Sequence, residues 1–171
     1  QYFSQIVDVL YKQSLEHWRS DLLVWPEGAI PAYQHQVEDI VDDLNRRAKQ
    51  TNTDLLLGLP VYHEKEKISY AAFVALGDYQ QTYHKQVLVP FGEYLPLASL
   101  LRGLIEFFNI PMSSFSPATT KQQAMSFADY QVIPAICYEI AYPDIVHNLI
   151  ADADEHANKA KLLVTVSNDA W

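Results

Sequence analysis

The chain contains one cysteine, Cys137, which ends an apolar run and is followed at once by Tyr138 and Glu139. A free cysteine is usually a small buried hydrophobic side chain. The other role open to it is that of a nucleophile at the end of a strand. A free thiol, with a pKa of about 8.5, is mostly protonated at neutral pH, so a nucleophilic cysteine needs a nearby base or cation. This stretch alone leaves both roles open.

Two charged residues elsewhere in the chain could activate the thiol of Cys137. Glu27 directly follows a proline that stops an apolar run, and it is either a solvated loop acid or a base. Lys85 follows a strand-like run and precedes an apolar loop in which Glu93 is the one further charge before Arg102. Such a loop must fold back onto the protein, so we expect both charges to have partners nearby, either in a structural ion pair or in a site. Glu27 could supply the base for a thiol nucleophile and Lys85 the cation.

Metal and phosphate chemistry find little support in the sequence. The six histidines show no ligand spacing such as H-E-x-x-H, and His84 would point to the opposite strand face from its neighbour Lys85. The five glycines are scattered, which gives no phosphate-binding loop. The formal net charge of -9 disfavours nucleic acid as a partner. We therefore predict no metal, no cofactor and no nucleic acid.

Length and composition predict one folded domain over residues 1–171. Hydrophobic residues make up 49% of the chain, enough for a sizeable core. No stretch approaches the roughly eighteen apolar residues of a membrane span, and the first residues lack the regions of a signal peptide. The last residues run from a strand-like segment into a loop that stops on Trp171, so we expect both ends to be cut from a longer protein.

Apolar periodicity predicts alternating helices and strands. Helical spacing predicts helices at 2–17, 37–48, 97–108 and 144–153. Short apolar or alternating runs predict strands at 21–25, 54–59, 68–76, 81–84, 124–127, 130–136 and 161–167. The first of these strands is expected to be covered on both faces, and Pro134 assigns the sixth to an edge position or a bulge. Together the elements predict a layered α/β domain with helices packed on a mostly buried sheet.

The candidate reactive residues share one position relative to these strands. Glu27, Lys85 and Cys137 each follow the end of a predicted strand. In layered α/β folds, chemistry collects in loops at the carboxyl ends of strands, where a rigid scaffold carries side chains into an open crevice. We therefore expect the carboxylate, the ammonium and the sulfur to meet around one hollow.

Five short motifs occur in a recognisable order. They are W-P-E-G-A at 25–29, H-K-x-x-L-V-P-F-G-E-Y-x-P at 84–96, P-M-S-S-F-S at 111–116, I-C-Y-E-I at 136–140 and S-N-D-A-W at 167–171. Each motif is weak alone, but five in this order are hard to obtain by chance. In them the chain resembles the nitrilase-like domain of the apolipoprotein N-acyltransferase family.

The resemblance implies a nitrilase-like four-layer αββα sandwich, here partial, with a Glu-Lys-Cys triad. In that triad Glu27 would be the general base, Lys85 would stabilise the tetrahedral oxyanion, and Cys137 would be the acylated nucleophile. It also implies supporting active-site roles for three further residues, Glu93, Tyr138 and Glu139.

The activity implied by the resemblance is acyl transfer in lipoprotein biosynthesis. A fatty acyl group would pass from a phospholipid, through a Cys137 thioester, to the N-terminal amine of a diacylglyceryl-cysteine apolipoprotein. Family members carry this domain between transmembrane helices, on the periplasmic side of the bacterial inner membrane. The resemblance therefore leads us to expect such helices outside the present sequence.

Two other functions use the same residues differently. A soluble carbon-nitrogen hydrolase (amidase) would have the same triad but release its acyl group to water. A non-catalytic relative would serve as a binding or scaffold domain, although the intact triad positions argue against it. The apolar segments 87–97 and 107–112 are expected either to shield the thioester and contact acyl chains or the bilayer, or to pack in the core.

Overall fold

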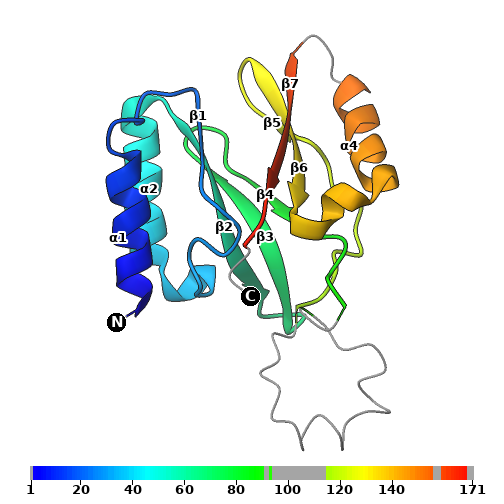
Figure 1. Cartoon of the computed structure of the whole chain (residues 1–171), viewed down its shortest axis with the longest axis horizontal. Coiled ribbons are helices and arrows are strands. Elements are labelled where there is room, and N and C mark those ends of the chain that lie inside the picture. Colours follow the sequence, from blue (N-terminus) through cyan, green and yellow to red (C-terminus); the bar gives the residue numbers. More distant parts are fainter. Residues whose placement is uncertain (1, 91–92, 94–114, 156–158, 169–171) are drawn as a thin grey trace, which may run out of the picture.

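The computed structural model describes residues 2–90, 93, 115–155 and 159–168. Two sheets face each other and helices cover their outer sides, which gives four layers (Figure 1). Helices α1 (Tyr2–Ser14) and α2 (Glu38–Thr51) pack on the first sheet, and α4 (Pro143–Glu155) packs on the second. The expected αββα sandwich is therefore confirmed.

The first sheet has the strand order β1-β2-β3-β4. Its strands are β1 (Leu22–Val24), β2 (Asp54–His63), β3 (Ile68–Leu76) and β4 (Gln81–His84). Strand β1 runs parallel to β2, and the other neighbours are antiparallel. The run Leu55-Leu56-Leu57 is apolar at every position because alternate residues enter different cores: Leu55 and Leu57 face the helices and Leu56 joins the core of the second sheet.

Two predictions for this sheet need correction. Strand β1 contacts both cores, but its three residues are only half-buried, because β1 lies at the edge of the described sheet. Strand β2 continues past Leu59, where it was expected to end. Pro60 has no backbone N–H to donate to a neighbouring strand. It is tolerated inside β2 because β1 pairs with β2 only as far as Leu56, so no partner on that side needs such a donor.

The second sheet has the order β5-β6-β7, with β5 (Met125–Ser126), β6 (Tyr130–Ile136) and β7 (Ala160–Val166). Strand β6 is antiparallel to β5 and parallel to β7. The prediction of an edge position or a bulge for β6 is wrong, because β6 is the middle strand of this sheet and pairs with β7 residue for residue from Tyr130 to Ile136. Pro134 fits there because β5 pairs only with Gln131 and Val132, which leaves the later part of β6 unpaired on that side among the described strands.

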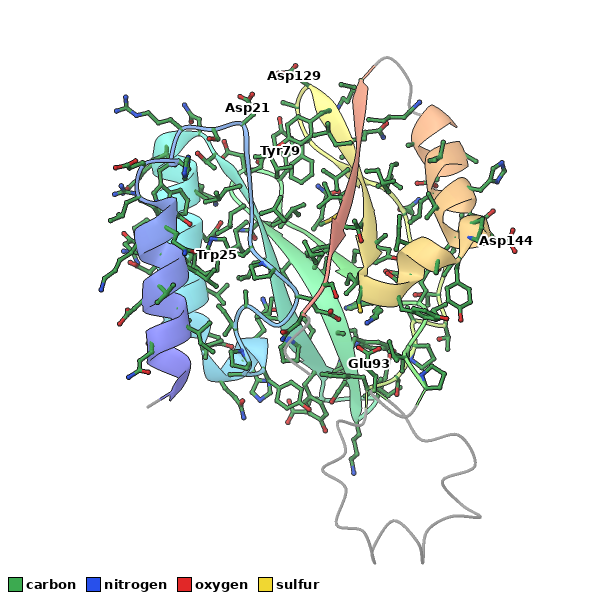
Figure 2. The ribbon with its side chains drawn as sticks, in the orientation of Figure 1. Asp21, Trp25, Tyr79, Glu93, Asp129 and Asp144 are labelled. Carbon is green, nitrogen blue, oxygen red and sulfur yellow. The ribbon has the colours of Figure 1, made fainter. Side chains whose placement is uncertain are left out.

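Polar contacts fasten the layers together. The indole N–H of Trp25 donates to Ser14 Oγ at 2.9 Å, which ties the end of the first sheet to α1. At one end of the sandwich, the Tyr130 hydroxyl donates across the sheets to Asp54 Oδ2 at 2.7 Å. Figure 2 shows Asp21, Tyr79 and Asp129 at that end and Glu93 at the opposite end. Glu93 lines a pocket together with Glu27 and Cys137 and binds Lys85, so the residues predicted to react lie around Glu93.

The remaining predictions for the elements have mixed outcomes. Helix α1 ends at Ser14 rather than residue 17, while α2 and α4 each run slightly past the predicted ranges. The expected helix at 97–108, the apolar segment 107–112 and most of 87–97 fall outside the described residues. Among the helices that are described, none has the length and apolar character needed to cross a bilayer.

Candidate active site

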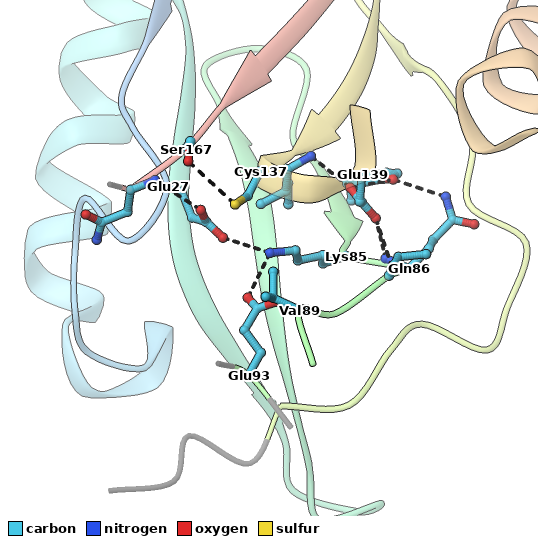
Figure 3. A network of polar contacts seen from close by, with 12 residues as sticks. Glu27, Lys85, Gln86, Val89, Glu93, Cys137, Glu139 and Ser167 are labelled. Carbon is cyan, nitrogen blue, oxygen red and sulfur yellow. Dashed lines mark hydrogen bonds and ion pairs between the residues drawn. The ribbon is translucent and has the colours of Figure 1, made fainter. Parts of the chain in front are cut away.

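The three residues predicted to react each lie shortly after the end of a strand. Glu27 comes after β1, Lys85 follows β4, and Cys137 begins the short 3-10 helix η2 (Cys137–Ala141) after β6. Glu27 and Cys137 line the same pocket, whose volume is about 280 Å³. The apolar part of its wall includes Leu59, Pro60, Val89 and Phe115. Figure 3 shows the sulfur of Cys137 pointing toward the Glu27–Lys85 pair.

Lys85 is the central charge of the site. Its side chain is 0% exposed, and its Nζ donates to Glu27 Oε1 at 3.0 Å and to Glu93 Oε1 at 2.8 Å. Burial of the ammonium lowers the pKa of Lys85, but hydrogen bonds and charges from Glu93 and Glu27 outweigh burial, so the pKa is raised. Lys85 is therefore a cation at neutral pH, held between two carboxylates.

Each of these two carboxylates is also fixed by a backbone donor. The Val89 N–H donates to Glu93 Oε2 at 2.8 Å, and the Asn168 N–H donates to Glu27 Oε2 at 3.2 Å. Both acids thus use one oxygen for Lys85 and the other for the main chain. Such charge-assisted bonds fix the direction of a carboxylate as well as its position.

The turn that carries Glu27 rests directly on strand β2. A Cβ atom placed on Gly58 would lie 2.4 Å from the carbonyl oxygen of Pro26 and 2.9 Å from the Cα of Glu27. Gly58 is thus the residue that lets this turn approach the sheet. Gly28, with a φ of +61°, completes the turn in the left-handed region that glycine adopts without strain.

Cys137 has an unusual backbone conformation for a residue with a side chain. Its φ is +54°, in the left-handed region, at the point where β6 gives way to η2. The side chain is half-buried, so the sulfur is neither sealed in the core nor fully in solvent. Ser167 Oγ donates a hydrogen bond to the sulfur at 3.5 Å. A strained backbone that places a thiol at a pocket wall is typical of a functional position.

Glu139 joins the loop of Lys85 to the turn of Cys137. Its side chain is 0% exposed and accepts four hydrogen bonds. The donors are the N–H groups of Gln86 (2.5 Å), Val87 (3.3 Å) and Ile136 (2.8 Å), and the hydroxyl of Tyr83 (3.1 Å). Burial raises the pKa of Glu139 more than these four donors lower it. The acid therefore connects the loop after β4 of the first sheet to the turn after β6 of the second.

The other residues considered in the sequence lie away from the pocket. Tyr138 is 47% exposed and makes an edge-to-face contact with Tyr142 at 5.5 Å, so its supporting role stays a prediction. The ring of His84 packs on Tyr70, tilted by 33° at a centroid distance of 4.6 Å, and His84 does not line the pocket. Within the described residues, no group of three or more His, Cys, Asp or Glu side chains is arranged to hold a metal.

Sequence reasoning gave no role to three residues that shape the site: Gly58, Ser167 and Asn168. Ser167 and Asn168 belong to the S-N-D-A-W motif, which therefore carried a signal for them. Gly58 had no such signal, because its importance comes from contact with a turn about thirty residues earlier in the chain.

The chain is similar in sequence to a known family and to curated proteins. A family model described as carbon-nitrogen hydrolase matches residues 3–171. The chain is 42% identical over 153 residues to Apolipoprotein N-acyltransferase of Pseudomonas putida, a match covering 88% of this chain and 29% of that protein. It is 38% identical over 161 residues to Apolipoprotein N-acyltransferase of Coxiella burnetii, covering 94% and 32%. The chain thus spans about a third of the length of these curated relatives.

Solved structures with the same fold are more distant in sequence. A carbon-nitrogen hydrolase from Helicobacter pylori G27 superposes with a TM-score of 0.63 at 14% identity, covering 96% of this chain and 53% of the other. An amidase from Nesterenkonia sp. AN1 superposes with a TM-score of 0.63 at 17% identity, covering 99% and 61%. That amidase is a mutant with the acetamide moiety of fluoroacetamide covalently added at its active-site cysteine.

Proposed function

This chain belongs to the carbon-nitrogen hydrolase family, and from that premise we propose that it carries the active site of an apolipoprotein N-acyltransferase. Glu27 is the general base, Lys85 stabilises the oxyanion, and Cys137 is the nucleophile that becomes acylated. The donor is a phospholipid and the acceptor is the N-terminal amine of a diacylglyceryl-cysteine lipoprotein. The site works on the periplasmic side of a bacterial inner membrane.

One observation carries this proposal. Cys137 shares a pocket with Glu27, and the carboxylate of Glu27 is bonded to the fully buried ammonium of Lys85. A base, a cation and a thiol at one pocket are what covalent acyl transfer needs. The likeness to relatives named for N-acyltransferase activity, at 36–42% identity, supports this chemistry over other reactions of the family.

The first half-reaction forms the thioester. Glu27 takes the thiol proton as the sulfur of Cys137 attacks the ester carbonyl at the first glycerol position of the phospholipid. Lys85 has three N–H donors and uses two for Glu27 and Glu93, so the third remains for the developing oxyanion. The ester C–O bond then breaks, and the lysophospholipid alkoxide leaves with the proton from Glu27.

The second half-reaction passes the acyl group to nitrogen. The α-amine of the lipoprotein attacks the thioester while Glu27 removes its proton. The C–S bond breaks and the thiolate of Cys137 is regenerated and reprotonated. The apolar wall formed by residues such as Leu59 and Phe115 suits a fatty chain and disfavours water, which would hydrolyse the thioester.

An amidase is the second candidate, because the fold is shared with the amidase from Nesterenkonia sp. AN1. The two functions differ in the fate of the acyl group, so one experiment separates them. The full-length polypeptide is incubated with phospholipid in detergent, and the mass of the peptide containing Cys137 is measured. We expect an added fatty acyl group that is absent in Cys137→Ala.

Addition of a diacylglyceryl-cysteine peptide completes the experiment. Transfer of the acyl group to the peptide amine, with recovery of free Cys137, supports the acyltransferase. Loss of the adduct to water at the same rate with and without peptide would support the amidase. No adduct in a folded, phospholipid-saturated protein would reject the acyltransferase.

A further inference from the structure

The end of strand β7 lies beside both the proposed nucleophile and the proposed base. In the parallel pair of β6 and β7, Ile136 lies opposite Val166, so the next residues, Cys137 and Ser167, leave the sheet side by side. Ser167 Oγ donates to the sulfur of Cys137 at 3.5 Å (Figure 3). The following N–H, of Asn168, donates to Glu27 Oε2 at 3.2 Å. One dipeptide thus contacts both partners of the proton transfer.

We propose that Ser167 is a further catalytic residue, whose hydroxyl stabilises the thiolate of Cys137 while the N–H of Asn168 aims the Glu27 carboxylate at the thiol. This inference rests on the proposed role of Cys137 as nucleophile. The thiol proton passes to Glu27, and Ser167 keeps its own proton throughout. The hydroxyl acts only as a hydrogen-bond donor.

The charges around the sulfur show why a neutral donor matters. Among the described residues, the charged groups at this part of the site are the carboxyls of Glu27, Glu93 and Glu139 and the ammonium of Lys85. Lys85 is the only cation in that set and is already shared by two carboxylates, so these charges do little to favour a negative sulfur. A hydroxyl donor stabilises the thiolate without adding a charge.

The same hydrogen bond acts in both half-reactions. A donor binds an anionic sulfur more strongly than it binds a thiol or a thioester. Before acylation it therefore raises the fraction of thiolate. During transfer to the amine it stabilises the departing thiolate, and a more stable thiolate leaves faster.

The test measures the reactivity of Cys137 without any acyl donor. The rate of alkylation of Cys137 by iodoacetamide is followed by mass spectrometry across the pH range in the full-length polypeptide. We expect Ser167→Ala to shift the midpoint of the pH profile upward by about half to one unit and to slow alkylation at neutral pH roughly three- to tenfold. Ser167→Thr keeps the hydroxyl and should retain the wild-type profile.

Thr165→Val is the matched control, because Thr165 is an exposed hydroxyl residue on β7, two positions before Ser167. It should leave the profile unchanged. A Ser167→Ala midpoint equal to wild type, or the same shift in Ser167→Thr or Thr165→Val, would overturn the assignment. Because alkylation needs no phospholipid, a shifted midpoint in a protein that forms no acyl adduct would support Ser167 while rejecting the proposed function.

Discussion

Lys85 and Glu27, 58 residues apart in the chain, form an ion pair of 3.0 Å in which the lysine side chain is 0% exposed and the glutamate side chain 16%. Glu93, 12% exposed, binds the same ammonium at 2.8 Å. The lysine has no contact with bulk solvent, while both acids keep a little. Loss of the cation would therefore leave two poorly hydrated carboxylates facing each other.

Replacing Lys85 by Met tests this arrangement, because Met has similar length and no charge. Breaking a buried ion pair from one side leaves an uncompensated charge, so we expect the free energy of unfolding to fall by about 3 kcal/mol. Thioester formation should fall to background. Urea unfolding and the adduct measurement give the two readouts.

Arg46→Met is the control for that substitution. Arg46 pairs with Asp43 at 2.7 Å, but the two side chains are 63% and 62% exposed, and such a surface pair contributes less than about 1 kcal/mol. An equal loss of stability in both variants would contradict the special role assigned to burial at Lys85.

Much of this site could be predicted from the sequence because it depends on local patterns. A proline after an apolar run placed Glu27 at a strand end, and the lack of other charges in the loop after Lys85 indicated that Glu93 had a partner nearby. The spacing of apolar residues also located the strands, because it indicates which residues face a core.

Other features depend on which strands become neighbours, and periodicity does not report that. The pairing of Ile136 with Val166, which brings Ser167 to Cys137, joins segments thirty residues apart. The middle position of β6 was missed because Pro134 favours an edge strand, and only the shortness of β5 makes it acceptable. Which strands become neighbours is decided by the packing of the whole sandwich.

Cys137 offers a test of backbone strain. A residue with a Cβ in the left-handed region costs roughly 1 kcal/mol, and glycine does not bear this cost. We expect Cys137→Gly to have a free energy of unfolding about 1 kcal/mol higher than Cys137→Ala, with both variants inactive. Ala135, a fully buried position in β6, is the control. There Ala135→Gly should be less stable than wild type, which is the usual order of the two residues. Equal stability of the two Cys137 variants would mean that the left-handed backbone stores no strain.

Gly58→Ala is predicted to impair catalysis through the position of Glu27. The added Cβ would meet the carbonyl of Pro26 at 2.4 Å, so the turn must move away from β2. We expect at least a tenfold lower rate of thioester formation and a stability loss of about 1–3 kcal/mol.

Gly77→Ala is the control. The φ of Gly77 is +119°, and a Cβ there would lie 3.1 Å from the carbonyl oxygen of Thr53. This substitution is therefore strained too, but at a turn away from the pocket. Full activity in Gly58→Ala, or equal loss in Gly77→Ala, would contradict the role of this close approach.

His84 predicts how stability changes at acid pH. Burial lowers its pKa, as does the neighbouring His63, whose ring centroid is 5.2 Å away. A histidine whose folded pKa is lowered stabilises the folded state above the unfolded value of about 6.5, and this contribution is lost as the pH falls from there through the lowered pKa. Urea midpoints at about pH 7.5 and about pH 5 should therefore differ less in His84→Phe than in wild type, because phenylalanine keeps the ring packing on Tyr70 but binds no proton.

His147, which is exposed on α4, serves as the control. His147→Gln should keep the wild-type difference between the two urea midpoints. The same acid sensitivity in His84→Phe as in wild type would show that protonation of this half-buried histidine does not cause the loss of stability at acid pH.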